Sequence, residues 1–206
     1  MSEIIIPIPQ MAKETMQLPD PSLLQFYRDY ENRVYWLIGE VDDCTYDIMQ
    51  MILQYNKEDR EIEPEKRKPF RIFIASPGGL LDNARSLVAL MRMSITPIYT
   101  VAVGQVASAA SLIYLAGNYR YAISNASFMW HKGGCDNLNG TFDQIAAFTN
   151  QYEKEIKDLV DFYKERTKFD GALIESKLRG DWYINLDEAI ENGAVDEIIE
   201  DIDILL

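Results

Sequence analysis

The feature that most constrains this chain is a long run without a charged residue, from Met93 to Tyr119, in a protein that has 33 acidic and 20 basic residues. A run of this length raises the possibility of a membrane-spanning helix. Pro97, Gly104 and Gln105 would make a poor span, however, as would the threonines and serines around them. The two halves are typical of a buried strand, "PIYTVAV", then a turn and a buried helix, "SAASLIYLAG". We therefore interpret the run as the centre of a soluble core.

Length and charge limit the classes of function. A chain of 206 residues with 48% hydrophobic content fits a single domain, 1–206, with a substantial core. The net charge of -13 argues against general binding to nucleic acid or to anionic membrane surfaces, since both require basic patches. Cys44 and Cys135 have no metal-ligand spacing and are expected to be free thiols in a reducing compartment. We therefore expect a cytoplasmic protein without a metal site.

The N-terminal segment, 1–20, is expected to be an irregular arm. It lacks the basic start, the sustained apolar stretch and the cleavage site of a secretory signal. Its three isoleucines, 4–6, are followed by Pro7 and Pro9, which do not suit a helix. Two interpretations stay open, an edge strand or a contact for a partner.

The first half of the chain alternates between strand and helix patterns. A helical pattern, "SLLQFYRDYENR", leads into "VYWLIG", and that run and "FRIFIAS" are continuous apolar stretches, typical of parallel strands buried on both faces. The segments "DDCTYDIMQMILQYN" and "LLDNARSLVALMRM" place apolar residues at helical spacing. The run 57–69 between them, "KEDREIEPEKRKP", is predicted to be a solvated connection. This alternation predicts an α/β fold with a parallel sheet.

The second half contains two short predicted strands, "RYAIS" and "SFMWH", and a glycine-rich stretch. A long amphipathic helix is predicted from Thr141 to about Arg166, and a helix of this length favours contact with another subunit. A short helix follows, with Asn185 as N-cap and Gly193 as its stop, and then a final strand.

Three features have the residue types that catalysis requires. Ser108 is expected where a buried strand turns into a helix, and a serine hydroxyl becomes a nucleophile only with a base and an oxyanion site. The single histidine, His131, is the available base. The turn "SPGG", 76–79, brings backbone N–H groups close to a substrate. Each has a purely structural alternative, as a helix cap, a core imidazole or a conformational turn.

Together, "FIASPGG", "GQVASAAS", "FMWH" and "RGDWYINLDEAIENGAVDEI" resemble the Clp protease proteolytic subunit, the ClpP family of serine peptidases, in order and approximate spacing. The resemblance runs from about Asn32 to Ile199. It implies an α/β fold of the ClpP/crotonase type, a spiral of repeated strand-helix units. It also implies a projecting handle region at about 133–168, and it gives the arm, 1–20, the position of the axial loops.

The resemblance assigns roles to three side chains. It implies that Ser108 is the nucleophile, His131 the general acid and base, and Asp181 the residue that orients the histidine. The residues alone do not select Asp181, because other acids are equally plausible: Asp136, Asp143 and Asp170.

The resemblance also assigns roles to backbone groups. It implies that the amides of Gly78 and Ala109 form the oxyanion hole, and that Gly79 and Leu80 bind substrate. No cofactor is expected in this chain.

The expected partners follow from the same resemblance. It implies a homo-oligomer of stacked rings, typically two heptamers, which receives polypeptide substrates from an AAA+ unfoldase that consumes ATP. The chain departs from the family at "HKGG", where a Gln-Pro pair commonly follows the histidine, and "ASAAS" is closer to phage-type members. Three alternatives stay open: a catalytically silent structural subunit, a capsid-maturation protease of the phage type, and a crotonase-type acyl-CoA enzyme.

Overall fold

The computed structural model describes residues 20–134, 139–201 and 203. The predictions for Cys135, for Asp136 and for nearly all of the arm, 1–20, lie outside these residues. The helices are α1 (Pro21–Glu31), α2 (Cys44–Glu58), α3 (Leu81–Met93), α4 (Ala109–Leu115), α5 (Phe142–Arg166), α6 (Gly171–Lys177) and α7 (Leu186–Glu191). The strands are β1 (Val34–Val41), β2 (Phe70–Gly79), β3 (Ile98–Ala107), β4 (Tyr119–Ala122), β5 (Ser127–Trp130), β6 (Trp182–Ile184) and β7 (Glu197–Ile198).

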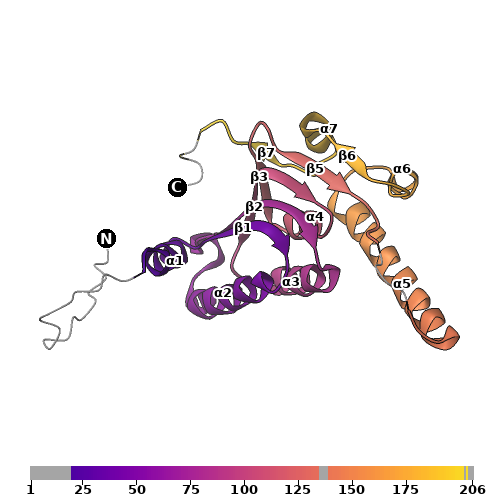
Figure 1. Cartoon of the computed structure of the whole chain (residues 1–206). Helices are drawn as coiled ribbons and strands as arrows, with labels where there is room; N and C mark the ends of the chain where they lie inside the picture. Colours follow the sequence, from indigo (N-terminus) through magenta and orange to yellow (C-terminus); the bar gives the residue numbers. More distant parts are fainter. Residues whose placement is uncertain (1–19, 135–138, 202, 204–206) are drawn as a thin grey trace, which may run out of the picture.

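One parallel sheet organises the chain, in the order β1-β2-β3-β4-β7 (Figure 1). Strand β3 has two partners on the same side, because its first half pairs with β4 and its last residues pair with β5. Strand β5 in turn pairs with β6, which is antiparallel to it. The predicted α/β alternation with a parallel sheet is confirmed. Strand β6 and helix α6 were not predicted, because they are short and have no clear apolar periodicity.

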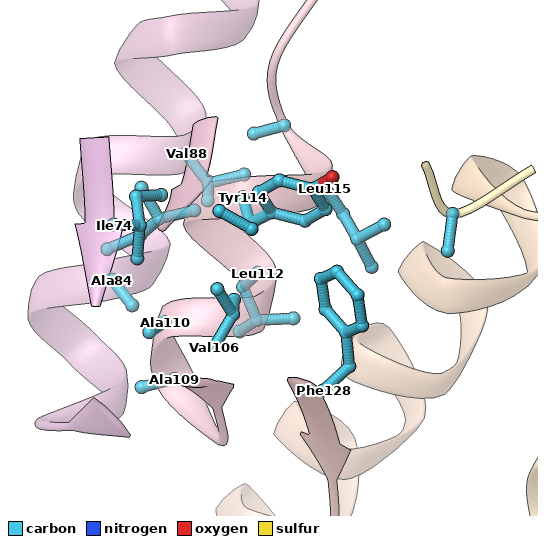
Figure 2. Close-up of a cluster of buried hydrophobic side chains, with 14 of the residues drawn as sticks. Ile74, Ala84, Val88, Val106, Ala109, Ala110, Leu112, Tyr114, Leu115 and Phe128 are labelled. Atoms are coloured by element: carbon cyan, nitrogen blue, oxygen red, sulfur yellow. The ribbon is translucent and has the colours of Figure 1, made fainter. Parts of the chain in front are cut away.

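The uncharged run forms the middle of the core, as β3 and α4. Every residue of α4 is buried, and the apolar side chains around it come from β2, β3, α3 and β5 (Figure 2). In Figure 2, Ala109 and Ala110 face Ala84 and Ile74, while Tyr114 and Leu115 lie above Phe128. The small residues at the start of α4 let it approach the sheet closely. Among the described helices, none combines the length and apolar character that a bilayer span requires.

Helix α5 begins where the sequence predicts and extends away from the sheet (Figure 1). Thr141 caps it in a reciprocal capping box with Gln144. Its buried residues all lie in its second half: Leu159, Val160 and Tyr163. The first half of α5 therefore contributes no buried residue to the core of its own chain.

The prediction that the "VYWLIG" strand is buried on both faces is wrong. Strand β1 is the edge strand of the sheet, and the side chains of Trp36 and Ile38 are 49% and 60% exposed. Trp36 stacks on Phe73 of the neighbouring strand at 4.3 Å between ring centroids. An apolar run indicates a strand, but it does not show whether a single chain covers both faces.

The prediction that 57–69 is a solvated connection is also wrong in part. The segment continues α2 and includes two short 3-10 turns, and Asp59 within it is fully buried. The Asp59 carboxylate accepts two hydrogen bonds from Arg33, at 2.7 and 2.8 Å, and one from Thr96 at 2.6 Å. This ion pair ties the end of α2 to the residue that precedes β1 and to the loop that precedes β3. Burial alone would raise the pKa of Asp59, but the hydrogen bonds from Arg33 and Thr96 outweigh burial and lower that pKa.

We predict that Arg33→Met strongly destabilises the fold, because it leaves the Asp59 carboxylate buried without its cation. Loss of one partner of a buried pair costs about 3 to 5 kcal/mol. The pKa of Asp59 is lowered in the folded protein, so its stabilisation is present above the unfolded-state pKa of about 3.9 and is lost as the pH falls through the lower folded pKa. The loss of unfolding free energy in the Arg33→Met variant should therefore become smaller as the pH falls. Urea denaturation at about pH 7 and about pH 3 measures both effects.

The matched control is Lys66→Met, which removes an exposed pair with Glu63 whose side chains are 70% and 62% exposed. It should cost less than about 1 kcal/mol at either pH. Equal losses in the two variants would contradict a structural role for the Arg33–Asp59 pair.

Candidate active site

The turn from β3 to α4 holds Ser108 in an unusual backbone conformation. Its φ of 53° and ψ of -128° lie in a region that costs a residue with a side chain about 1 to 3 kcal/mol. The Ser108 N–H donates to the Met129 carbonyl at 2.8 Å, and its own carbonyl accepts the Ser111 N–H and hydroxyl. Ser108 occupies the N-cap position of α4, but its side chain makes no capping hydrogen bond. The Ser108 hydroxyl therefore does not cap the helix and is available to bond another side chain.

Two strand registers bring the other two side chains to Ser108. Strands β3 and β5 are parallel, with Ala107 opposite Met129, so both strands end side by side at Ser108 and His131. Strands β5 and β6 are antiparallel, with Trp130 opposite Trp182. The residue after β5, His131, therefore faces the residue before β6, which is Asp181.

The three predicted catalytic side chains form one hydrogen-bonded chain. The Ser108 Oγ atom lies 2.6 Å from His131 Nε2, and His131 Nδ1 lies 3.1 Å from Asp181 Oδ1. With the Nδ1 proton directed to the carboxylate, His131 Nε2 accepts the hydrogen bond that the Ser108 hydroxyl donates. The imidazole is partly buried, whereas the Asp181 carboxylate is 56% exposed.

The other acids that the sequence left open have different surroundings. The Asp170 carboxylate caps α6 by accepting the N–H groups of Ala172 and Leu173. Asp143 lies in the first turn of α5. Asp136 lies outside the described residues. Of the candidate acids that the structure describes, Asp181 is the one with a hydrogen bond to His131.

The glycine turn at the end of β2 lies directly beside the serine. A Cβ atom added to Gly78 would lie 2.6 Å from Ser108 Cβ and 2.9 Å from the Ala109 nitrogen, and Gly78 has a φ of +97°. Only glycine fits there. The Gly78 N–H donates to the buried Ser76 hydroxyl at 3.1 Å. The Ala109 N–H belongs to the first turn of α4, where amides lack partners within the helix.

A groove of about 650 Å³ opens onto the serine and the histidine. The predicted substrate-binding residues Gly79 and Leu80 line it, as does the segment that follows His131, from Lys132 to Gly134. The far wall comes from α5 and consists of Phe148, Tyr152, Glu155 and Leu159. The periodicity of the sequence places Tyr152 and Leu159 on one face of a helix, but it does not indicate that this face meets the serine.

The described residues offer no group of three or more His, Cys, Asp and Glu side chains that could hold a metal ion. Cys44 in the described part of the chain is a free thiol, and burial is the main cause that raises its pKa.

A hydroxyl, an imidazole and a carboxylate in this order form the arrangement that serine hydrolases use on several unrelated folds. Residues 24–202 match the family model described as Clp protease. This match spans most of the chain, so the chain belongs to the Clp protease family, and the resemblance found in the sequence is confirmed. The family supports a peptidase of the Clp type.

A comparison with solved structures leads to the same fold. The chain is similar to a mutant of ClpP1 from Listeria monocytogenes, with a TM-score of 0.75 and 22% sequence identity. The similarity covers 88% of this chain and 99% of that chain. The predicted ClpP-type α/β fold is confirmed.

We predict that Gly78→Ala slows the chemistry of the groove about 100-fold while the chain still folds. The added methyl group would force Ser108 or Gly78 to move, and a displacement of about 1 Å at a catalytic group can cost about 100-fold in rate. The rate of serine labelling by a fluorophosphonate probe measures this loss, and circular dichroism reports on folding.

The matched control is Gly180→Ala, because a Cβ atom there meets nothing within 4 Å. This control should label at the wild-type rate. A Gly78→Ala protein that labels as fast as the control would contradict the close approach of Gly78 to Ser108.

Proposed function

We propose that this chain is a serine endopeptidase that cleaves peptide bonds inside a ring-shaped assembly of its own copies. The observation that supports it most directly is the hydrogen-bonded chain from Ser108 through His131 to Asp181, at 2.6 and 3.1 Å. Membership of the Clp protease family supports the same activity. The alternative of a silent structural subunit would not require these three groups to meet at a groove.

In the proposed mechanism, the Ser108 oxygen attacks a substrate carbonyl carbon while His131 Nε2 takes the hydroxyl proton. The C–N bond of the tetrahedral intermediate then breaks as His131 returns that proton to the leaving amine. Water attacks the acyl-enzyme in the same way and frees Ser108. Asp181 holds the imidazole in one orientation and stabilises its charged form throughout.

The oxyanion would be stabilised by backbone amides at the two turns beside Ser108. The Ala109 N–H lies in the first turn of α4, next to the nucleophile. The Gly78 N–H is the proposed second donor, and it would exchange its bond to the Ser76 hydroxyl for the oxyanion. Gly79 and Leu80 line the adjoining groove, where they would contact the substrate backbone.

The groove supports a polypeptide substrate with an apolar side chain near the cleaved bond. The α5 wall presents Phe148, Tyr152 and Leu159 to the space in front of Ser108. Glu155 on the same wall is paired with Arg85 at 3.5 Å, so its charge is partly neutralised. Burial of an apolar side chain against such a wall contributes roughly 1.5 to 3 kcal/mol to binding.

The exposed apolar side chains of the single chain support assembly into a homo-oligomer. Those on α1, on the edge strand β1 and on the first half of α5 are Leu23, Leu24, Phe26, Tyr27, Trp36, Ile38, Phe142 and Phe148, and others lie elsewhere on the surface. Large exposed apolar surfaces mark contact sites. The family implies stacked rings, typically heptamers, and an AAA+ unfoldase that would consume ATP and deliver substrates. The proposed chemistry itself uses protein groups and water.

We predict that a fluorophosphonate probe modifies Ser108 in the purified assembly. Ser108→Ala should abolish labelling and cleavage of fluorogenic peptides, and His131→Ala should reduce both by about 1,000-fold or more, since no base remains to take the proton. The matched control is Ser127→Ala, a change at an exposed serine of β5, which should behave as wild type. Absence of labelling in folded, assembled wild-type protein would favour the silent subunit.

We also predict that the active species is much heavier than the 23.7 kDa chain. Light scattering on the fraction that cleaves short peptides should give the mass of a ring or of two stacked rings. The same fraction should leave a folded protein uncut without an added ATPase. A fully active monomer would contradict the proposed compartment.

A further inference from the structure

The histidine is held firmly on one side by strand β5. The Ser108 N–H donates to Met129, and the ring of Trp130 is fully buried, stacked on Tyr163 at 4.4 Å and 6°. Trp130 also meets Trp182 edge to face. The backbone up to His131 is therefore fixed by hydrogen bonds to the neighbouring chain segment and by packed aromatic rings.

After His131, the sequence itself gives the backbone no such support. His131 is followed by Lys132, Gly133 and Gly134. Gly133 has a φ of +80°, and a Cβ atom on Gly134 would meet nothing within 4 Å. Two adjacent glycines give a backbone great conformational freedom, so this segment requires an outside contact to stay in place.

Helix α5 supplies that contact through Tyr152. The Tyr152 hydroxyl donates to the Lys132 carbonyl at 2.9 Å, one residue after the histidine. The hydroxyl also lies beside Gly133, because a Cβ atom there would come within 3.5 Å of it. The Tyr152 ring stacks on Phe148 at 6.0 Å and 11°, and both rings line the groove.

We propose that Tyr152 is a positioning residue for His131, taking over the role that a stiffer sequence after the histidine would otherwise play. The inference rests on the proposed serine peptidase function. By fixing the Lys132 carbonyl, Tyr152 limits rotation of the backbone on the far side of the imidazole. The 2.6 Å contact between His131 Nε2 and Ser108 Oγ then depends on a helix that is distant in sequence.

Tyr152 lies in the half of α5 that provides no buried residue to the core. Removal of one hydroxyl there should therefore leave global stability nearly unchanged. A loss of activity without a loss of stability would separate a positioning role from a structural one.

The decisive variant is Tyr152→Phe, which keeps the ring and its stack on Phe148 and removes the hydroxyl. We expect kcat for a fluorogenic peptide and the rate of fluorophosphonate labelling to fall about three- to tenfold, the size of one lost hydrogen bond. KM should change less than about twofold and the thermal midpoint should stay the same, because the groove wall and the core are intact. The matched control is Tyr46→Phe, at an exposed tyrosine of α2.

A second variant tests the mechanism of positioning. Gly134→Ala stiffens the segment at a position with space for a methyl group. The fall in kcat caused by Tyr152→Phe should therefore be smaller when it is measured against Gly134→Ala than when it is measured against the wild type, whatever Gly134→Ala does alone. A drop in kcat for Tyr152→Phe that Gly134→Ala does not relieve would overturn the proposed stiffening role.

A third readout does not depend on activity. His131 is the single histidine of the chain, so carbon-13 histidine labelling gives one imidazole NMR signal without further assignment. We expect this signal to shift or broaden in Tyr152→Phe and to stay unchanged in Tyr46→Phe. An unchanged signal in Tyr152→Phe would overturn the inference whatever the activity, whereas a changed signal in a protein that never labels at Ser108 would count against the proposed function alone.

Discussion

The strained turn at Ser108 is the constraint on which the rest of the site depends. Its positive φ costs about 1 to 3 kcal/mol, and the surrounding structure has to supply at least that much. Helix α4 does so, because all its residues are buried, and each large apolar side chain contributes roughly 1.5 to 3 kcal/mol. The absence of charge from Met93 to Tyr119 therefore has a physical reason. A charged residue in α4 would weaken the packing that holds the nucleophile in place.

The sequence predicts Ser108 and His131 as candidates because each lies at the end of an apolar run. Parallel strands that end together bring such residues to one edge of a sheet, and β3 and β5 do so here. The sequence brought Ser108 and His131 together only through the family resemblance, because the alternation does not show which strands are neighbours. Asp181 is different, since it depends on the antiparallel pairing of β6, a strand of three residues without periodicity. Only the family resemblance placed it at the site. The side chains from α5 could not be assigned either, because periodicity does not show which element a helix faces.

The two wrong predictions have a common cause. An apolar run in β1 and a charged run at 57–69 were interpreted from local composition, but burial depends on what lies opposite. Strand β1 is at the sheet edge and exposes Trp36 and Ile38, whereas Asp59 is buried because Arg33 and Thr96 satisfy its carboxylate. Local composition alone does not show whether a residue is buried, because burial also depends on the partners that the fold brings to that residue.

Helix α5 is bound to both sides of the proposed catalytic chain. Arg166 at its end donates to the carbonyls of Leu115 and Gly117, and Tyr163 shares a hydrogen bond with Ser111, so α5 fixes the helix that begins after Ser108. Tyr152 reaches the segment after His131. The buried half of α5 holds α4 and, through Tyr163 stacked on Trp130, the strand that leads to His131, whereas the exposed half reaches the segment after the histidine. A partner subunit that packs on the exposed half would therefore reach the proposed catalytic chain through the segment after His131, and through His131 the bond to Ser108.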